Sequence, residues 1–592
     1  MMGGLRRMLA SAAGWCVRLP GEGQIDRSLR LLVAAVVLLF PSTCLLVNRS
    51  DSVSLLLLLF IGFWVWVRNG FKSELGRREW LFVAVFAGFF LSGVLAFEFG
   101  HQTDAGFRLL GRYLRFLFAL PALLSLRRYR PPAAVVWAGL GLGALVLGLD
   151  AVWERVTAGG FLRPEGDTNV AILFGDMTMI TTFAFAAGYV YIDERLPRAG
   201  PWLVAGCVFM GLLASFLSGT RGAWIAIPVL LVLFLSCRHL LRPRTVLLGS
   251  GTVAALFVAL MLLPQTHILD RVDGAISQIR TYWAVNPYAG RSSGAPRCLD
   301  NAEVLRAWVD ADGGEYPKGF SIDIAQLHGT DAVLLAGYGC ADRTVVQMSN
   351  RGKETAWVQL RRYVPSYTGL TSTQMLVRGT GDAGYSRPDY VPQRINARQF
   401  TLMTVTGPSR YGRAIALAIH PGDALWFVPK ESYYGEYRYA VLETSIGQRL
   451  EMWWVAWHLM SKAPLLGVGT GAYQAETQKL VAAGEAAPDT ADYDHPHSDY
   501  FDAMSSRGLV GLLALLALLG LPAWLCARGI DSLDAHCMGA ALGGLLVAVG
   551  FAIFALTETM FVHSLTIGWY VIMTTIFLVN ADAAGGQDVG KR

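Results

Sequence analysis

Charged residues are scarce in this sequence. Asp, Glu, Lys and Arg make up 16% of its 592 residues, whereas soluble domains carry about 25% of them. Hydrophobic residues account for 54%, and the mean hydropathy is +0.42. A single soluble core cannot bury so much apolar surface, whereas a bilayer accepts it. The composition therefore predicts a polytopic membrane protein.

Other absences narrow the class further. The eight cysteines are scattered with no Cys-x-x-Cys pair, so no zinc or redox motif is indicated. The net charge of +6 comes with arginines in short loops between apolar runs, so it does not indicate nucleic-acid binding. No P-loop is present. The first apolar run is too long for a cleavable signal peptide, so we expect it to remain as the first span.

Long apolar runs are the dominant feature of the sequence. About twelve of them reach the roughly 17–25 residues that span a bilayer as a helix. We expect about nine spans in residues 1–265 and about three in residues 506–592, which end in a short tail. The fourth run is the weakest, because Arg112 and Arg115 interrupt it. The predicted fold class is an all-α polytopic membrane protein.

The loops between these runs differ in charge. Alternate loops are rich in Arg and Lys, beginning with the N-terminal segment, and loops of this kind face the cytoplasm. An even number of spans then places both termini in the cytoplasm. The long polar region between about 266 and 505 lies on the other side, which for a bacterial inner membrane is the periplasm.

The first part of this large periplasmic loop, residues 266–443, is predicted to carry an inserted soluble domain. Between about 290 and 438, short alternating runs such as AVLLAGY and AIALAI are separated by Gly, Pro, Asn and Asp. This pattern is typical of short strands and predicts a β-rich domain, either a sandwich or a small barrel. An oxidising compartment would allow a disulfide between Cys298 and Cys340, and two free cysteines are the alternative.

The second part of the loop, residues 444–505, begins with an amphipathic segment. Ile446, Leu450, Trp453, Trp457 and Met460 recur at the spacing of one helical face. The segment is too polar to span, and its tryptophans suit the boundary between water and lipid. We therefore expect an interfacial helix that lies on or just above the membrane.

Candidate catalytic residues follow this helix, in the stretch DHPHSDYFDAMSSRGLVG at residues 494–511. His495 and His497 stand where a polar, acidic segment turns into an apolar run, and titratable groups at such an entry point are candidates for function. The alternative is a solvated loop in which Ser498 or Asp499 caps the helix. The spacing of the histidines could suit a metal, but no convincing third ligand is seen, so no metal site is predicted.

Two arginines are candidates for binding an anion. Arg221 lies in SGTRGAW, just before the eighth span, where a helix N-terminus and a guanidinium group together suit phosphate oxygens. Its alternative role is to anchor the span at the membrane surface. Arg449 lies on the predicted interfacial helix, where a solvated residue on a polar face is the alternative.

Together, these motifs resemble the O-antigen ligase and O-antigen polymerase superfamily, and they are most similar to the ligases. In order, they are Ser-x-x-Arg-Gly-x-Trp, Gly-Gln-Arg-x-x-x-Trp, Pro-Leu-Leu-Gly-Val-Gly and the histidine stretch. In that stretch His497 and Ser498 are followed by nine residues, Gly508, two residues and Gly511. The family usually has Asn where this chain has Ser498. The resemblance covers about 170–265 and 444–580, and it says nothing about the insertion.

The resemblance implies a glycosyltransferase that moves a glycan from undecaprenyl diphosphate to an acceptor hydroxyl at the periplasmic face of the inner membrane. The acceptor would be lipid A-core for a ligase or a further glycan for a polymerase, and a protein O-oligosaccharyltransferase is a third option. Membrane lipid is the surrounding partner. No cofactor, metal or nucleic acid is implied.

The resemblance also implies roles for particular residues. His497 would be the general base, and Arg221 and Arg449 would bind the donor diphosphate, with direct attack inverting the anomeric centre. His495 and Asp499 could orient the imidazole or the acceptor. Arg507 would anchor the tenth span or contact phosphate.

Two classes without transferase activity are the alternatives. A glycan transporter would need charged residues distributed through its spans, and the runs here are nearly uncharged. A glycan-binding scaffold would bind through the insertion alone and would not need His497.

The charge alternation predicts which loops a membrane-impermeant thiol reagent can reach in intact cells. A cysteine introduced in the loop at residues 127–130 should be shielded, whereas one introduced near Gly469 should be labelled. The reverse labelling pattern would overturn the assignment of sides, and with it a periplasmic site.

Overall fold

The computed structural model describes residues 23–236 and 445–582, together with ten strands between residues 320 and 429. Residues 74, 158–162, 169, 483–485 and 487 are gaps in the two long segments. The chain divides into two compact units, of which the first comprises residues 1–257 and 452–592 and the second comprises residues 258–451. Each unit is considered by itself.

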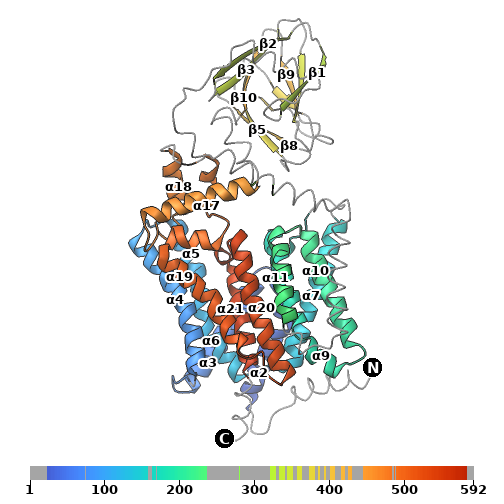
Figure 1. Cartoon of the computed structure of the whole chain (residues 1–592), viewed down its shortest axis with the longest axis vertical. Coiled ribbons are helices and arrows are strands. Elements are labelled where there is room, and N and C mark those ends of the chain that lie inside the picture. Colours follow the sequence, from blue (N-terminus) through green and yellow to red (C-terminus); the bar gives the residue numbers. More distant parts are fainter. Residues whose placement is uncertain are drawn as a thin grey trace. The chain divides into compact units, whose positions relative to one another are not determined.

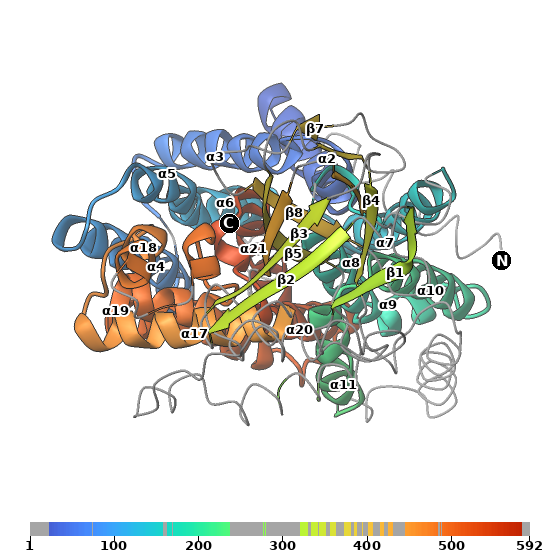
Figure 2. The same cartoon turned by 90° about the horizontal axis from the view of Figure 1, so that it is seen from above.

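The first unit begins with helices of a bundle in which α3 to α6 lie on one side and α7 lies beside α10 (Figures 1 and 2). They are α2 (Gln24–Leu46), α3 (Ser50–Arg68), α4 (Arg77–Phe99), α5 (Asp104–Tyr113), η1 (Leu114–Phe118), α6 (Ala119–Arg128) and α7 (Ala133–Thr157). α5, η1 and α6 together make one candidate span, Asp104–Arg128. Its middle is a 3₁₀ segment that contains Arg115, and Arg112 lies in the last turn of α5 just before it.

A second group of helices follows the short 3₁₀ turn η2 (Gly166–Thr168). They are α8 (Ala171–Ala186), α9 (Tyr189–Arg195), α10 (Gly200–Ser218) and α11 (Arg221–Ser236). α8 and α9 are bent by 48° at a short break, so they count as one broken span or a re-entrant pair. The predicted ninth run, near residue 254, lies outside the described residues.

The C-terminal part of the first unit contributes the remaining helices. They are the end of α17 (Ser445–Lys462), then α18 (Tyr473–Ala482), η7 (Pro488–Asp492), α19 (Asp499–Ala527), α20 (Ala535–Thr557), η8 (Met560–Val562) and α21 (Ser564–Ala581). Within the described segments, nine helices are long and apolar enough to cross a membrane, or ten if the bent pair counts as one span. The helical membrane fold is therefore as predicted, whereas the count of twelve is not reached.

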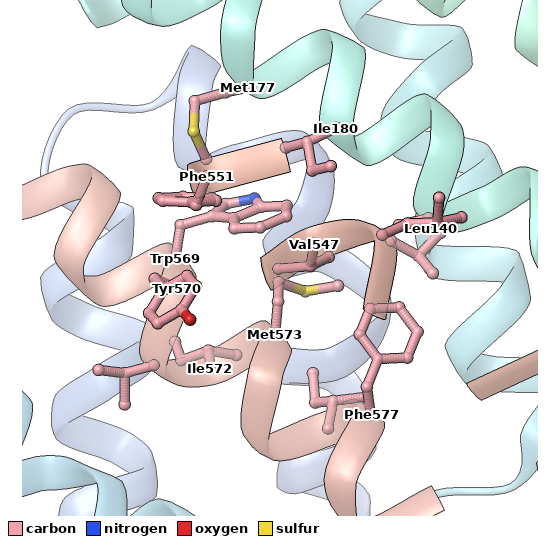
Figure 3. Close-up of a cluster of buried hydrophobic side chains, with 14 of the residues drawn as sticks. Leu140, Met177, Ile180, Val547, Phe551, Trp569, Tyr570, Ile572, Met573 and Phe577 are labelled. Atoms are coloured by element: carbon pink, nitrogen blue, oxygen red, sulfur yellow. The ribbon is translucent and has the colours of Figure 1, made fainter. Parts of the chain in front are cut away.

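The core of the bundle is formed by α20 and α21. The most apolar stretches of α21 and α20 are 83% and 72% buried, and no other candidate span exceeds 56%. Their aromatic side chains interlock, with Phe551 stacked on Trp569 and tilted against Tyr570 (Figure 3). α20 also packs against α8, α11 and α19. The connection between α20 and α21 is consequently held at the end of the most rigid part of the bundle.

α17 is the helix expected from the amphipathic segment. Met452, Val455, Ala456 and Leu459 are buried, and the last three form a small hydrophobic cluster with α18. Trp457, from the stripe noted in the sequence, is 58% exposed. The stripe is thus partly packed on protein, because Trp453 stacks on Phe501, and Trp457 is the member left open for the predicted contact with lipid.

The second unit contains the ten strands, which pair into two five-stranded antiparallel sheets with orders β1-β4-β9-β6-β7 and β2-β3-β10-β5-β8. Their bounds are β1 (Phe320–His328), β2 (Val333–Cys340), β3 (Arg343–Asn350), β4 (Ala356–Arg362), β5 (Ser372–Gly379), β6 (Gly384–Ser386), β7 (Gln393–Arg394), β8 (Thr401–Thr406), β9 (Ile415–Ile419) and β10 (Ala424–Pro429). Cys340 ends β2, and Cys298 lies outside the described residues, so their bonding stays a prediction.

Whether residues 290–438 fold as an independent β-rich domain is tested by producing that segment alone. We expect a far-ultraviolet circular dichroism spectrum dominated by β structure and a cooperative thermal transition, because the alternating runs can pair among themselves. A mainly helical or unfolded spectrum would contradict this prediction.

Candidate active site

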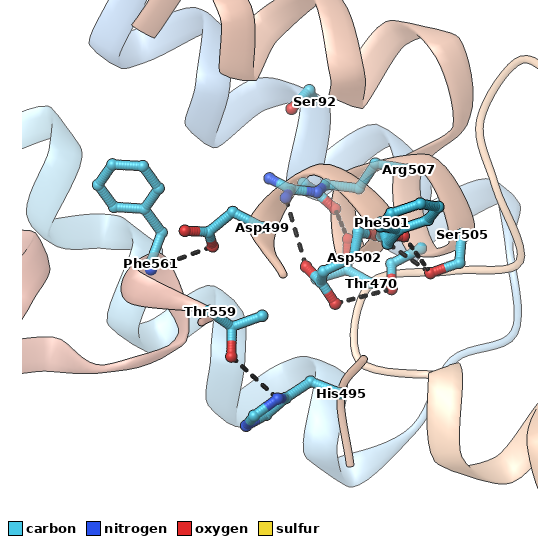
Figure 4. A network of polar contacts seen from close by, with 12 residues as sticks. Ser92, Thr470, His495, Asp499, Phe501, Asp502, Ser505, Arg507, Thr559 and Phe561 are labelled. Carbon is cyan, nitrogen blue, oxygen red and sulfur yellow. Dashed lines mark hydrogen bonds and ion pairs between the residues drawn. The ribbon is translucent and has the colours of Figure 1, made fainter. Parts of the chain in front are cut away.

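The start of α19 is attached to the end of α20 and to the turn that follows it by three buried hydrogen bonds. The Ser498 hydroxyl donates to the Ala555 carbonyl over 3.0 Å. The Asp499 carboxylate accepts the backbone N–H groups of Met560 at 2.9 Å and Phe561 at 3.2 Å (Figure 4). The alternative prediction was that Ser498 or Asp499 caps α19. Neither side chain makes that capping hydrogen bond. These bonds hold the segment with the two histidines against the α20–α21 turn.

His497 adopts an unusual backbone conformation at this junction. Its φ is +48°, and among the described residues Arg49 and Phe71 are the other non-glycine residues with positive φ. Such a conformation costs about 1–3 kcal/mol and persists where the surroundings enforce it, which is most often at functional sites. The ring Nδ1 lies 3.0 Å from Glu558 Oε1. The strained backbone therefore aims the imidazole at a carboxylate.

Glu558 is almost completely buried, at 3% exposure. Burial alone would raise the pKa of this carboxyl, but the hydrogen bond and charge of His497 and the Thr559 N–H outweigh it and lower the pKa to about 2. Since that pKa is below the ordinary value of 4.5, the carboxylate stabilises the fold at neutral pH. This stabilisation is lost as the pH falls from 4.5 towards about 2.

The ionised Glu558 also sets the proton positions on His497. A carboxylate can only accept a hydrogen bond, so in the neutral form of the His497 ring the proton lies on Nδ1 and Nε2 keeps its lone pair. The His497 side chain is 26% exposed, so the ring is reachable from solvent. An imidazole held in this way can take a proton from a hydroxyl group.

His495 lies beside this pair. The centroids of the His495 and His497 rings are 4.7 Å apart. Nδ1 of His495 is 2.9 Å from the Thr559 hydroxyl, and Nε2 is 3.3 Å from the Asp494 carboxylate. Burial lowers the pKa of His495 to about 4, so the ring is neutral at pH 7. Both ring nitrogens are engaged, which suits a supporting residue better than a base.

The other predicted supporting residues have structural contacts. Asp499 is engaged with the η8 backbone, as described above, and so positions the turn that carries Glu558. Arg507 is 1% exposed, lies over the Phe89 ring at 4.4 Å and contacts the Asp502 carboxylate at 3.5 Å (Figure 4). Its guanidinium group fixes α19 against α4 inside the bundle.

The Pro-Leu-Leu-Gly-Val-Gly motif fills a break in α19. Gly508 has φ +61° and ψ −153°, which interrupts the helix. The freed backbone groups pair with the motif, as Leu509 N donates to Pro464 O at 2.8 Å and Val468 N donates to Ser505 O at 2.9 Å. A side chain at Gly467 would clash with the backbone at Arg507, only 2.3 Å away. The glycines of the motif therefore allow close packing.

Arg221 begins α11, and its side chain lies outside the described residues. The next residue, Gly222, contacts the end of α20, since an added methyl group would lie 2.6 Å from Thr557 Oγ1. Thr220 donates to the Ala171 carbonyl over 2.9 Å, which holds the turn on α8. The start of α11 is thus adjacent to Thr557, the residue before Glu558. An anion bound at the start of α11 would therefore lie near His497.

Arg449 lies in the first turns of α17 and belongs to the second unit. Its contribution to the site stays a prediction. Later on the same helix, the Trp453 indole N–H donates to the Pro496 carbonyl over 3.0 Å, so α17 supports the histidine segment directly.

A metal could be held by the same residues. His495, His497 and Glu558 each offer a ligand atom, and these atoms lie within 4.8 Å of one another. Two imidazoles and one carboxylate form a donor set that zinc uses in hydrolytic sites. Glu558 is the third ligand that was not found in the sequence. Chelation of metal ions is therefore a direct test of the expectation that no metal is needed.

The sequence did contain a signal for Glu558. It is the only Asp, Glu, Lys or Arg between Asp534 and Asp582, in a stretch otherwise apolar enough for two spans. An isolated charge in such a stretch is a candidate for function. His563, whose ring lies 6.4 Å from that of His495, was also missed.

Comparison with known proteins gives a family match over part of the chain. Residues 415–516 match the family model described as O-antigen ligase. This match supports a relationship between that part of the chain and the O-antigen ligase and polymerase superfamily. It includes His495, His497 and the break at Gly508, and it ends before Glu558. The apolar helices of the described residues support a multi-pass membrane protein.

A protein of Haemophilus influenzae described as uncharacterized is similar to this chain. It is 24% identical over 273 residues, which are 44% of this chain and 64% of that protein. The chain thus spans less than two thirds of the length of this relative.

Replacement of Glu558 by Gln tests the pair. We expect glycan transfer to fall roughly 10²-fold, because the neutral amide no longer dictates the tautomer of His497. Steady-state transfer rates in membranes measure this loss.

The matched control is Glu476→Gln, because Glu476 also bonds a histidine, His101, at 2.8 Å but lies away from the site. It should retain wild-type rates. Wild-type transfer by the Glu558 variant would reduce the pair to a structural contact.

Proposed function

We propose that this protein transfers a glycan from undecaprenyl diphosphate to an acceptor hydroxyl at the periplasmic face of the bacterial inner membrane. The favoured reaction is ligation of O-antigen to lipid A-core. The observation that carries the proposal is the His497–Glu558 pair, held in a strained conformation beside the start of α11. The family match supports the reaction class.

The acceptor is activated by His497. A sugar hydroxyl is a weak nucleophile, and Nε2 of His497 takes its proton as the oxygen attacks the anomeric carbon of the donor. Glu558 stabilises the imidazolium ion that forms, as a carboxylate does in other histidine-based sites. The new C–O bond forms as the bond to the diphosphate breaks, and direct attack inverts the anomeric centre.

The donor is activated by positive charge. The diphosphate leaves with the bonding electron pair, so it needs charge neutralisation more than protonation. The N-terminal end of α11 and the guanidinium group of Arg221 would supply it next to Glu558. Arg449 is proposed as the second diphosphate ligand. No metal takes part in this mechanism.

Other acceptors would fit the same base and donor site. A repeat-unit polymerase and a protein O-oligosaccharyltransferase would use the same base and the same donor site. They differ in the acceptor hydroxyl alone, so mass spectrometry of the product from a complemented knockout strain separates them. The proposed orientation keeps both termini in the cytoplasm.

Replacement of His497 tests the proposal. We expect His497→Ala and His497→Asn to lose roughly 10²- to 10⁴-fold in transfer rate, the usual contribution of a general base. The Asn variant is the more informative one, because Asn tolerates a positive φ and should therefore keep the backbone conformation of this position. His495→Ala should cost less. Rates are measured in membranes supplied with donor and acceptor, with and without EDTA.

The outcomes separate the base from a metal centre. Retained binding of the lipid-linked donor by His497→Asn would show that the fold and the diphosphate site survive. If the His495 variant is inactive and the His497 variant is active, His497 is not the general base. Loss of activity in EDTA, restored by zinc, would replace the metal-free mechanism with one that uses the His495, His497 and Glu558 donor set.

A further inference from the structure

A polar cavity of about 420 Å³ lies in the first unit close to the candidate active site. Its walls come from the end of α2, the start of α3, the α5–η1 junction, η2 and the start of α21. Arg49, Arg112 and Arg115 line it. Two of them are the arginines that interrupt the fourth apolar run. Charged residues inside membrane spans are costly and are retained mainly for function.

The arginines have few partners within the protein. Arg112 Nη1 donates to the Val562 carbonyl, and Arg115 Nη2 donates to the Ser52 hydroxyl, both over 3.0 Å. Among the ion pairs of the described residues, none joins a carboxylate to Arg49, Arg112 or Arg115. Each guanidinium group has five N–H donors, so most of these donors remain for a ligand.

The other charges of the cavity leave it positive. Asp51 and Asp167 also line it, so two carboxylates stand against three guanidinium groups. The Asp51 carboxylate accepts a hydrogen bond from the Ser52 hydroxyl at 3.2 Å. The first turn of α3 adds the positive end of a helix. Arg49 precedes that turn with φ +61°, a second strained residue next to this part of the structure.

The cavity is connected to the catalytic pair through histidines. His563 lines the cavity, and its ring is 6.4 Å from that of His495, which neighbours His497. Arg112 bonds the carbonyl of Val562, the residue before His563. A substrate that reaches Nε2 of His497 could therefore extend a charged group into the cavity.

We propose that this cavity binds a phosphate group carried by one of the two substrates, an inference that rests on the proposed glycan transfer. Several guanidinium forks suit phosphate oxygens, whereas a neutral sugar would leave the charges without a counter-ion. The start of α11, which contacts the other side of the Glu558 turn, is assigned to the donor diphosphate. We therefore expect the phosphate group to belong to the acceptor. The alternative is that it belongs to the donor.

Kinetics of the full-length protein in nanodiscs identify the source. Arg115→Gln should raise the KM for a phosphorylated acceptor roughly tenfold with little change in kcat, because a charge-assisted hydrogen bond to the substrate is lost. Arg115→Lys should fall between wild type and Gln. The control is Arg108→Gln, an exposed arginine on α5 that does not line the cavity. It should match the wild type.

Phosphatase treatment of the acceptor then separates the two sources. If the acceptor carries the phosphate, treatment raises the wild-type KM to that of Arg115→Gln and leaves the variant unchanged. If the donor KM rises in the variant and treatment has no effect, the phosphate belongs to the donor. Unchanged KM values for both substrates in Arg112→Gln and Arg115→Gln would overturn the proposal.

A binding measurement keeps the cavity separate from the proposed reaction. Inorganic phosphate should raise the thermal unfolding temperature of an Arg221→Ala variant, in which the α11 site is removed. Adding Arg115→Gln should abolish that shift. An equal shift in both variants, or none in Arg221→Ala, would count against the cavity. A wild type that binds phosphate but transfers no glycan would refute the transferase and leave the cavity standing.

Discussion

The site depends on the buried carboxylate of Asp499, which accepts two backbone N–H groups from the start of η8. Through these bonds, the beginning of α19 and the turn after α20 become one rigid body, although they lie about sixty residues apart along the chain. Without these bonds, nothing would hold the Glu558 carboxylate at the distance at which it contacts His497. The strain in the His497 backbone is sustained by this attachment and by the support that α17 gives to Pro496.

The second constraint is the break in α19 at Gly508. A helix that entered the membrane without interruption would leave no place for the Pro-Leu-Leu-Gly-Val-Gly loop, whose backbone pairs with the freed groups. The buried Arg507 then fastens this end of the helix to the aromatic rings of Phe89 and Tyr113. The Pro-Leu-Leu-Gly-Val-Gly motif and Arg507 are thus structural, since they hold the part of α19 that follows the histidines.

The helical membrane fold and the histidine stretch were predictable, because apolar runs and a local motif are readable in one dimension. Glu558 was not predicted, because its importance arises from a contact with His497 that only the folded chain creates. The described residues do not reach the predicted count of about twelve spans, since α8 and α9 are a broken pair and α11 is short, and the run near residue 254 lies outside them. Arg112 and Arg115 were noticed as an interruption, but their common cavity depends on residues from α2, α3 and α21 that no sequence pattern connects.

The isolation of Glu558 has a consequence for how the last two helices enter the membrane. α20 and α21 form a hairpin whose turn carries the only charge between Asp534 and Asp582. Sliding the hairpin inward by one helical turn would draw this carboxylate towards the hydrocarbon, at a cost of up to about 2.5–3.5 kcal/mol. The glutamate that contacts His497 would thereby limit how deeply the hairpin inserts, which would keep His497 at the boundary between water and lipid.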